Sequence, residues 1–187
     1  MGDARNPAGP GPAREDEAAP LTARETAALS ALVEGLFPRD DLGPGAADIG
    51  VVDYLARAFL GPYRDWVPAY RRVLAALDAA AERDHGRRFA SLAPEARDAI
   101  IGRLERARLD GLRHPDDERF FTALCQHLRE GLFGDPIHGG NRGMLGWRLI
   151  GFPGAQFGYT EAEQELDAPI GREPRSVSDL HADRRGR

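Results

Sequence analysis

The amino-acid sequence predicts an all-α protein, a single domain of four to five helices with a long irregular C-terminal segment rich in glycine and aromatic residues. Apolar residues recur at helical spacing in five segments, and no segment alternates as a half-buried strand does. The 187 residues are enough for one domain with a substantial core. We expect this domain to span residues 21–167. The flanking residues 1–20 and 168–187, rich in proline, glycine, alanine and charge, are predicted to be disordered tails.

The first helix is expected to begin at Thr22 and to end before Pro38. Thr22 and Glu25 have the spacing of a capping box, in which each side chain binds the other residue's backbone N–H. A loop rich in glycine and proline then leads to a second helix at residues 47–60. The inward-facing residues of these two helices are predicted to be Leu29, Leu32, Val33, Leu36 and Phe37, followed by Val51, Tyr54, Leu55, Ala58 and Phe59.

Three further helices are predicted, at residues 62–84, at residues 94–111 and from residue 115 to Gly131 or Gly134. The last two each open with a proline and acidic residues, which suit the first turn of a helix. Their expected buried residues include Trp66, Tyr70, Val73, Leu74 and Leu77 in the first of the three, and Phe120, Phe121, Leu124, Cys125, Leu128 and Leu132 in the last.

The composition excludes several classes of function. All 25 basic residues are arginine, so a lysine-containing phosphate loop, a lysine Schiff base and a Ser-Lys dyad are ruled out. The net charge of -5 does not favour nucleic-acid binding, which usually needs a basic surface. No run approaches the roughly 18 apolar residues of a membrane span, so we expect no direct membrane insertion.

Cys125 is the only cysteine, which excludes an intrachain disulfide, a CxxCH haem site and a cysteine zinc cluster. Its place on an apolar helix face predicts a buried thiol, with contact to a partner chain as the alternative. The first 20 residues carry no export signal. We therefore expect the chain to be cytoplasmic, and periplasmic only if a partner exports it.

Motifs for catalysis or metal binding are sparse. Glu82 and His85 form one Glu-x-x-His pair near a helix end, and di-iron bundles use this spacing twice. The stretch "GGNRG" has neither a nucleotide-binding fingerprint nor a preceding strand. A metal-dependent enzyme using Glu82 and His85 remains one alternative, and a stand-alone helical scaffold is another.

The stretch "GDPIHGGNRGMLGWRLIGFPGAQFGY", residues 134–159, combines eight glycines with four aromatic residues. Glycine permits positive φ angles and close backbone approach. Tryptophan, tyrosine, arginine and methionine are enriched at the centres of protein interfaces. The aromatics are therefore candidates to bind a partner; equally, they can fold back and close the helical core, and their spacing favours neither reading.

Two stretches carry a resemblance to a known family. They resemble the gluconate 2-dehydrogenase subunit 3 family, the small subunit of flavin-dependent sugar and sugar-acid dehydrogenases. The C-terminal match comprises Gly139, Gly140, Asn141, Trp147, Gly151, Phe152, Pro153 and Gly154, and the earlier match comprises Pro38, Asp40, Gly43, Pro44, Gly45 and Ala46.

The resemblance implies a helical, cofactor-free accessory subunit that has no catalytic or metal-binding residue of its own. Its partner would be an FAD-containing catalytic subunit of the glucose-methanol-choline type, accompanied in many complexes by a cytochrome c subunit. We expect the C-terminal segment to form much of the contact with the catalytic subunit. The candidate partner-binding residues are His138, Gly139, Gly140, Asn141, Arg142, Met144, Trp147, Arg148, Phe152, Pro153, Phe157 and Tyr159.

Overall fold

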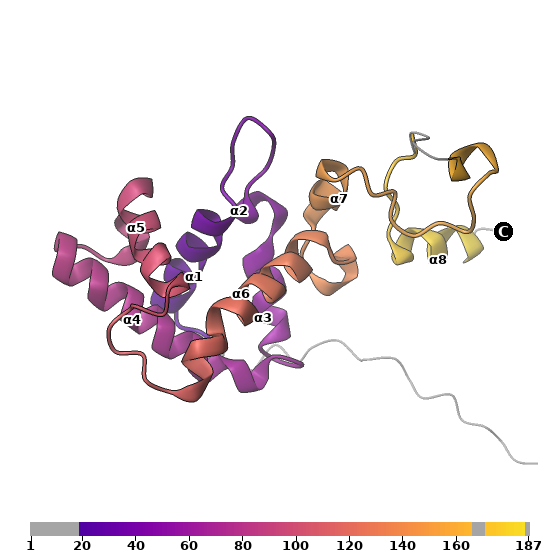
Figure 1. Cartoon of the computed structure of the whole chain (residues 1–187). Helices are drawn as coiled ribbons and strands as arrows, with labels where there is room; N and C mark the ends of the chain where they lie inside the picture. The colour runs from indigo at the N-terminus through magenta and orange to yellow at the C-terminus, as the bar shows by residue number, and fades with distance from the viewer. Residues whose placement is uncertain (1–18, 166–170, 186–187) are drawn as a thin grey trace, which may run out of the picture.

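The computed structural model describes residues 19–165 and 171–185, and these residues form a helical protein (Figure 1). Within these ranges there are eight α-helices and two isolated β-bridges, but no sheet. The predicted all-α class is confirmed, although the helices are more numerous than expected. They are α1 (Ala23–Leu36), α2 (Ala46–Ile49), α3 (Val51–Ala58), α4 (Val67–His85), α5 (Pro94–Glu105), α6 (Pro115–Phe133), α7 (Leu145–Leu149) and α8 (Val177–Arg185).

Helix α1 lies at the centre of the helical body and contacts α2, α3, α4 and α5. Its predicted capping box is confirmed: the Thr22 backbone N–H donates to the Glu25 carboxylate at 2.7 Å, and the Glu25 N–H donates to the Thr22 hydroxyl at 3.3 Å. The helix ends at Leu36, two residues before Pro38. Local sequence signals therefore determine both ends of the central helix.

Three expected helices have different boundaries. The helix expected at residues 62–84 begins at Val67, as α4. The predicted helix at residues 47–60 is divided at Gly50, whose φ of +87° ends α2 and begins α3. Helix α5 ends at Glu105 instead of Gly111. There, Ala107 adopts a φ of +51°, and the Arg108 N–H donates to the Arg103 carbonyl at 2.8 Å, which is the bond of a Schellman ending.

The hydrophobic core lies between α1, α3, α4, α5 and α6. Its aromatic centre is Tyr70, which makes edge-to-face contacts with Phe59 at 4.7 Å and with Phe120 at 4.8 Å between ring centroids. Cys125, expected to be buried, is only half-buried on α6, and burial raises the pKa of its thiol. The other predicted core residues that are fully buried include Leu29, Leu32, Val33, Leu55, Val73, Leu77, Leu124 and Leu132.

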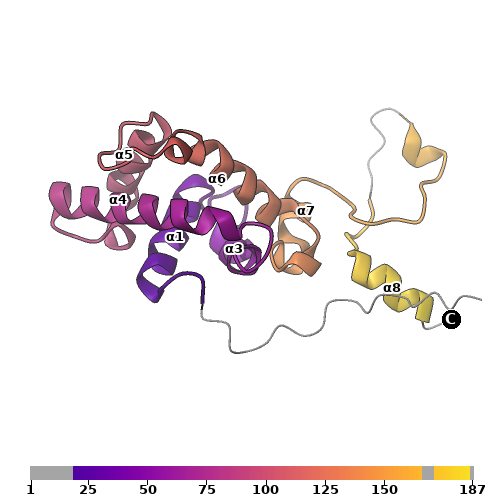
Figure 2. The same cartoon turned by 90° about the horizontal axis from the view of Figure 1, so that it is seen from below.

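The C-terminal part of the chain contains more regular structure than predicted. The expected irregular segment includes α7 and several short 3-10 turns, and α8 lies in residues that we expected to form a disordered tail. Figures 1 and 2 both show α8 and the loop before it standing away from the body formed by α1–α6. The predicted N-terminal tail falls largely on residues 1–18, which lie outside the described residues. None of the described helices is long and apolar enough to cross a membrane.

A polar cluster lies beside the core, between α3, α4 and α6. The Glu130 carboxylate accepts hydrogen bonds from the Tyr54 and Tyr63 hydroxyls at 2.6 and 2.5 Å. His127 is buried, stacks on the Tyr63 ring at 3.8 Å and shares a 2.9 Å hydrogen bond through Nδ1 with the Tyr70 hydroxyl. Burial lowers the pKa of His127, although the negative charge of Glu130 partly opposes this shift.

This burial predicts a loss of stability in mild acid. In the unfolded chain His127 takes up a proton near its ordinary pKa of 6.5, whereas the folded protein resists protonation. The free energy of unfolding should therefore fall as the pH decreases from 6.5 towards the lower folded-state pKa, by at most about 1.4 kcal/mol per pH unit. Urea unfolding between pH 8 and 5 measures this effect.

The control is His127→Gln, which keeps a hydrogen-bonding partner for Tyr70 but does not titrate. Its stability should depend less on pH over the same range. An equal pH dependence in both proteins would show that His127 is not responsible.

Candidate functional site

The glycine-rich segment after α6 caps the C-terminal end of that helix. The last carbonyl groups of a helix have no hydrogen-bond partner within the helix. Here the Asn141 backbone N–H donates to the Gly131 carbonyl at 2.8 Å, and the Asn141 side-chain amide donates to the Gly134 carbonyl at 2.9 Å. The Trp147 indole N–H donates to the Phe133 carbonyl at 2.6 Å. The segment thus satisfies three carbonyls at the helix end.

Two of the glycines are required because the segment lies against the backbone of α6. A Cβ atom on Gly140 would lie 2.2 Å from the Gly131 carbonyl oxygen, and one on Gly146 would lie 1.9 Å from the Leu132 carbonyl oxygen. The fully buried Asn141 holds this contact, because its side-chain oxygen accepts the Gly146 N–H at 2.9 Å. Much of the glycine content therefore serves close backbone packing.

Trp147 is part of the protein interior. Its side chain is only 4% exposed, and its ring meets Phe152 edge to face at 5.3 Å between centroids. The Gly154 backbone lies so close that a Cβ there would be 2.5 Å from the indole ring. Of the two roles considered for the aromatic residues, the structure supports packing in the interior for Trp147.

The packed segment also brings the two family-like stretches together, although they are about 100 residues apart in the sequence. Arg142 forms an ion pair with Asp53 in the first turn of α3, and its guanidinium lies against Gly50. Leu149 contacts the earlier loop, because a Cβ on Gly43 would lie 2.8 Å from its Cδ1 atom. The C-terminal stretch therefore contacts the earlier loop at Gly43 and the start of α3 at Asp53.

The earlier loop is held in shape by acidic side chains. The Glu34 carboxylate accepts the N–H groups of Arg39 and Ala47 at 3.1 and 2.9 Å. The Asp40 side chain accepts the Leu42 N–H at 2.8 Å, which places Leu42 at the loop tip with 83% of its surface exposed.

The two stretches carry four exposed apolar side chains, of which Ile150 is 56% exposed. We call these four residues the docking patch: Leu42, Leu149, Ile150 and Phe152. Exposed apolar side chains that gather on one face commonly mark sites where another protein binds.

The predicted partner-binding residues divide into three groups, and only some of them lie at the surface. The buried members are Gly140, Asn141, Trp147 and Pro153. The half-buried members are Gly139 and Met144, and the exposed ones are His138, Arg142, Arg148, Phe152, Phe157 and Tyr159.

Three patch residues were not predicted, namely Leu42, Leu149 and Ile150. The sequence signal was available in "WRLIGFPG", where an apolar pair lies between an arginine and a glycine. Helical spacing could not assign these residues to the surface, because α7 is only five residues long.

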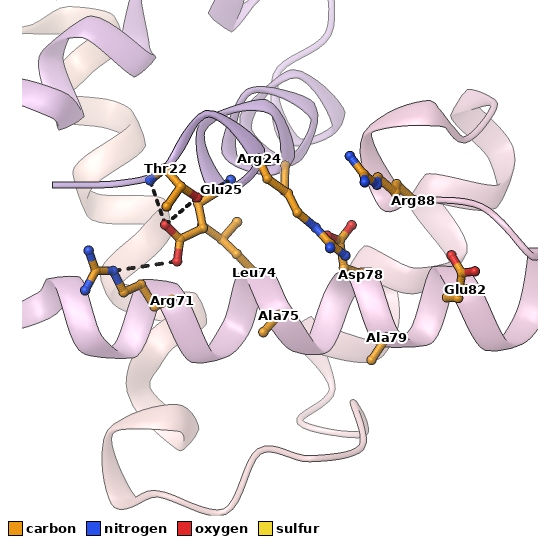
Figure 3. A pocket seen from close by; sticks show the side chains of 11 residues that line it. Thr22, Arg24, Glu25, Arg71, Leu74, Ala75, Asp78, Ala79, Glu82 and Arg88 are labelled. Atoms are coloured by element: carbon orange, nitrogen blue, oxygen red, sulfur yellow. Dashed lines mark hydrogen bonds and ion pairs between the residues drawn. The ribbon is translucent and has the colours of Figure 1, made fainter. Parts of the chain in front are cut away.

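The geometry gives little support to the metal-enzyme alternative. Glu82 and His85 are both exposed near the end of α4, and the part of the chain that the structure describes has no group of three or more potential metal ligands. Glu82 lines an open hollow of about 650 Å³ between α1 and α4 (Figure 3). Within it, Arg24 pairs with Asp78 at 2.7 Å, so much of the local charge is already compensated.

One comparison with known proteins gives a match, and it covers both stretches. Residues 23–154 match the family model described as Gluconate 2-dehydrogenase subunit 3. No curated protein and no solved structure matches the chain. The family match begins at α1 and ends at Gly154, next to the Trp147 ring.

The burial of Trp147 predicts a large effect on stability. Trp147→Ala should lower the free energy of unfolding by about 3 kcal/mol, because it leaves a cavity and removes the cap from the Phe133 carbonyl. Denaturant unfolding measures this loss. Leu42→Ala is the control, since an exposed position should change stability by no more than about 0.5 kcal/mol. Equal stability of the two variants would contradict the interior role of Trp147.

Proposed function

The chain belongs to the gluconate 2-dehydrogenase subunit 3 family, and from this premise we propose that it is a non-catalytic accessory subunit of a flavin-dependent sugar or sugar-acid dehydrogenase. In this role it binds and stabilises a catalytic subunit of the glucose-methanol-choline type. The FAD belongs to that partner, and the chain itself contributes no cofactor. A cytochrome c subunit is a further candidate member of the complex.

The docking patch is the observation that carries the proposal. Both stretches that resemble the family contribute to it, through Leu42 on one side and Leu149, Ile150 and Phe152 on the other. Burial of one leucine, isoleucine or phenylalanine side chain contributes about 1.5–3 kcal/mol. A surface of this kind is therefore a strong site for attachment when a complementary apolar surface covers it.

Binding at the patch provides a physical route to stabilisation. A subunit that binds only the folded form of its partner shifts the folding equilibrium of that partner by mass action. At a free concentration of about 100 times Kd, this shift amounts to about 2.7 kcal/mol. No catalytic group in the accessory chain is needed for this effect.

The same proposal extends to where the complex assembles. The chain is expected to meet its flavoprotein in the cytoplasm.

A stand-alone helical scaffold is a second candidate, favoured by the packing of Asn141 and Trp147 within the monomer. It leaves the exposed Ile150 and Leu42 without a role, whereas an accessory subunit explains both the packed and the exposed residues.

Partner binding should depend on the patch. Ile150→Asp is expected to weaken binding to a flavoprotein partner of the glucose-methanol-choline type by at least about 30-fold, because it places a charge in an apolar contact, a loss of about 2 kcal/mol. Isothermal titration calorimetry with the co-expressed and purified subunits measures the change.

The matched control is Leu60→Asp, since Leu60 is also exposed, at 41%, but follows α3 on another part of the surface. Its affinity should equal that of the unmodified chain. If both variants bind like the unmodified chain, the patch is not the docking surface. If the unmodified chain binds no such flavoprotein, the accessory role itself is wrong.

A further inference from the structure

A hollow of about 710 Å³ lies beside the polar cluster around Glu130, where α3 contacts α6 (Figure 1). Its volume is within the range of roughly 300–1,000 Å³ that is typical of small-molecule sites. An apolar wall is formed by Tyr54, Ala58, Pro62 and Ile137. A mostly apolar wall with a few polar groups is the usual composition of a ligand site, and the accessory role gives this hollow no function.

The Glu130 carboxylate is the negative group at the hollow, and its position is fixed. Three side-chain hydrogen bonds reach it, from the Tyr54 and Tyr63 hydroxyls at 2.6 and 2.5 Å and from the Gln126 amide at 3.1 Å. A carboxylate has about four acceptor positions, so one is left for a ligand. Burial raises the pKa of Glu130, but the three hydrogen bonds outweigh burial and hold this pKa below its ordinary value. The carboxylate is therefore ionised at neutral pH.

Arg57 is the positive group at the hollow, and α3 places it next to Glu130. Arg57 follows Tyr54 by three residues, so the two side chains leave the same side of α3, with about 5–6 Å between their Cβ atoms. The Arg57 side chain lies against Gly139, since a Cβ added there would be 2.7 Å from Arg57 Cδ. His138 lines the same end of the hollow. Within the part of the chain that the structure describes, the Arg57 guanidinium forms no hydrogen bond or ion pair, so its donors are available.

The two charges select the chemistry of the ligand. A ligand with only a positive group would be repelled by Arg57, and a ligand with only a negative group would be repelled by Glu130. A zwitterion satisfies both, because its carboxylate accepts from the planar guanidinium and its ammonium group donates to the carboxylate of Glu130. An α-amino acid has this pair of charges, and an apolar side chain on it matches the wall formed by Pro62 and Ile137.

We propose that this hollow is a binding site for a free α-amino acid with an apolar side chain, in which Arg57 binds the carboxylate and Glu130 binds the ammonium group. A free amino acid is favoured over an internal peptide segment, because the segment lacks both charged groups. The bound ligand joins α3 to α6 and stabilises the folded chain by mass action. The inference goes beyond the accessory role and is independent of it, because the isolated chain contains every group of the site.

Ligands that differ by one charged group test the proposal on the full-length chain at neutral pH. Leucine carries both groups, leucinamide lacks the carboxylate, and the hydroxy-acid analogue of leucine has a hydroxyl in place of the ammonium group. A two-dimensional NMR titration with leucine should show saturable shifts of the backbone N–H signals of Ile137, His138 and Gly139. The two analogues should each bind at least about 10-fold more weakly, because each loses one charge-assisted hydrogen bond.

Substitutions assign each charged group of the ligand to its residue. Arg57→Gln should bring leucine and leucinamide to within about 2-fold of each other, because the carboxylate no longer contributes. Glu130→Gln keeps an acceptor for the tyrosine hydroxyls and should likewise remove the preference for leucine over its hydroxy-acid analogue. The matched control is Arg64→Gln, since Arg64 is an exposed arginine in the turn after α3. This control should bind all three ligands as the unmodified chain does.

Arg57→Gln is the variant that decides, because Arg57 is exposed and its replacement should leave the thermal midpoint unchanged. The expected order of ligands, lost in Arg57→Gln and kept in Arg64→Gln, would support the site. The absence of saturable shifts at tens of millimolar leucine would overturn the inference, as would equal binding of leucine and its two analogues. Leucine shifts that persist unchanged in Arg57→Gln would also overturn it. Failure to bind a flavoprotein would remove the accessory role and leave this inference standing.

Discussion

The carbonyl groups at the end of α6, which have no hydrogen-bond partner within the helix, are the constraint on which the rest of the structure depends. A helix that ends inside a packed protein must find donors for these oxygens, since burying them unpaired costs about 1–3 kcal/mol each. The chain supplies the donors from Asn141 and Trp147, and it approaches closely enough only because Gly140 and Gly146 lack side chains. The capping hydrogen bonds, the glycines and the buried indole therefore all serve to pair the carbonyl groups at the end of α6.

The packing of the C-terminal stretch against the end of α6 also positions the residues of the docking patch. Once Asn141 fixes the turn, Arg142 reaches α3 and Leu149 reaches the loop at Gly43. The residues of the docking patch thus come from two distant stretches that contact each other, and Arg148 forms an ion pair with Glu173 farther along the chain. A rigid interior and an exposed apolar surface in one segment suit an accessory subunit, because a preorganised surface loses less entropy on binding.

Local signals in the sequence predicted the elements that depend on local physics. The Thr22–Glu25 capping box and the apolar periodicity placed α1 and the core faces of α4 and α6. The division at Gly50 was not predictable in this way, because a single glycine is compatible with a continuous helix. In the structure its φ is +87°, which separates α2 from α3.

The site was harder to predict because it depends on contacts between segments that are distant in the sequence. The aromatic residues of the C-terminal segment were recognised as a group, but their burial depends on tertiary contacts: Trp147 faces the α6 terminus, whereas Phe152 and Ile150 face outward. For α8 a local signal was present and overlooked. Ser176 and Asp179 bind each other's backbone N–H groups at 3.2 and 2.8 Å, as the residues of a capping box do.

The central claim is that the surface built on the α6 cap is where a flavoprotein partner binds. Hydrogen–deuterium exchange of the chain, measured alone and in complex with a flavoprotein partner of the proposed type, tests this claim most directly. The account predicts new protection of residues 38–46 and 148–159, with little change in the exposed face of α4. Protection confined to α4 and α5, with residues 148–159 exchanging as in the free chain, would contradict it.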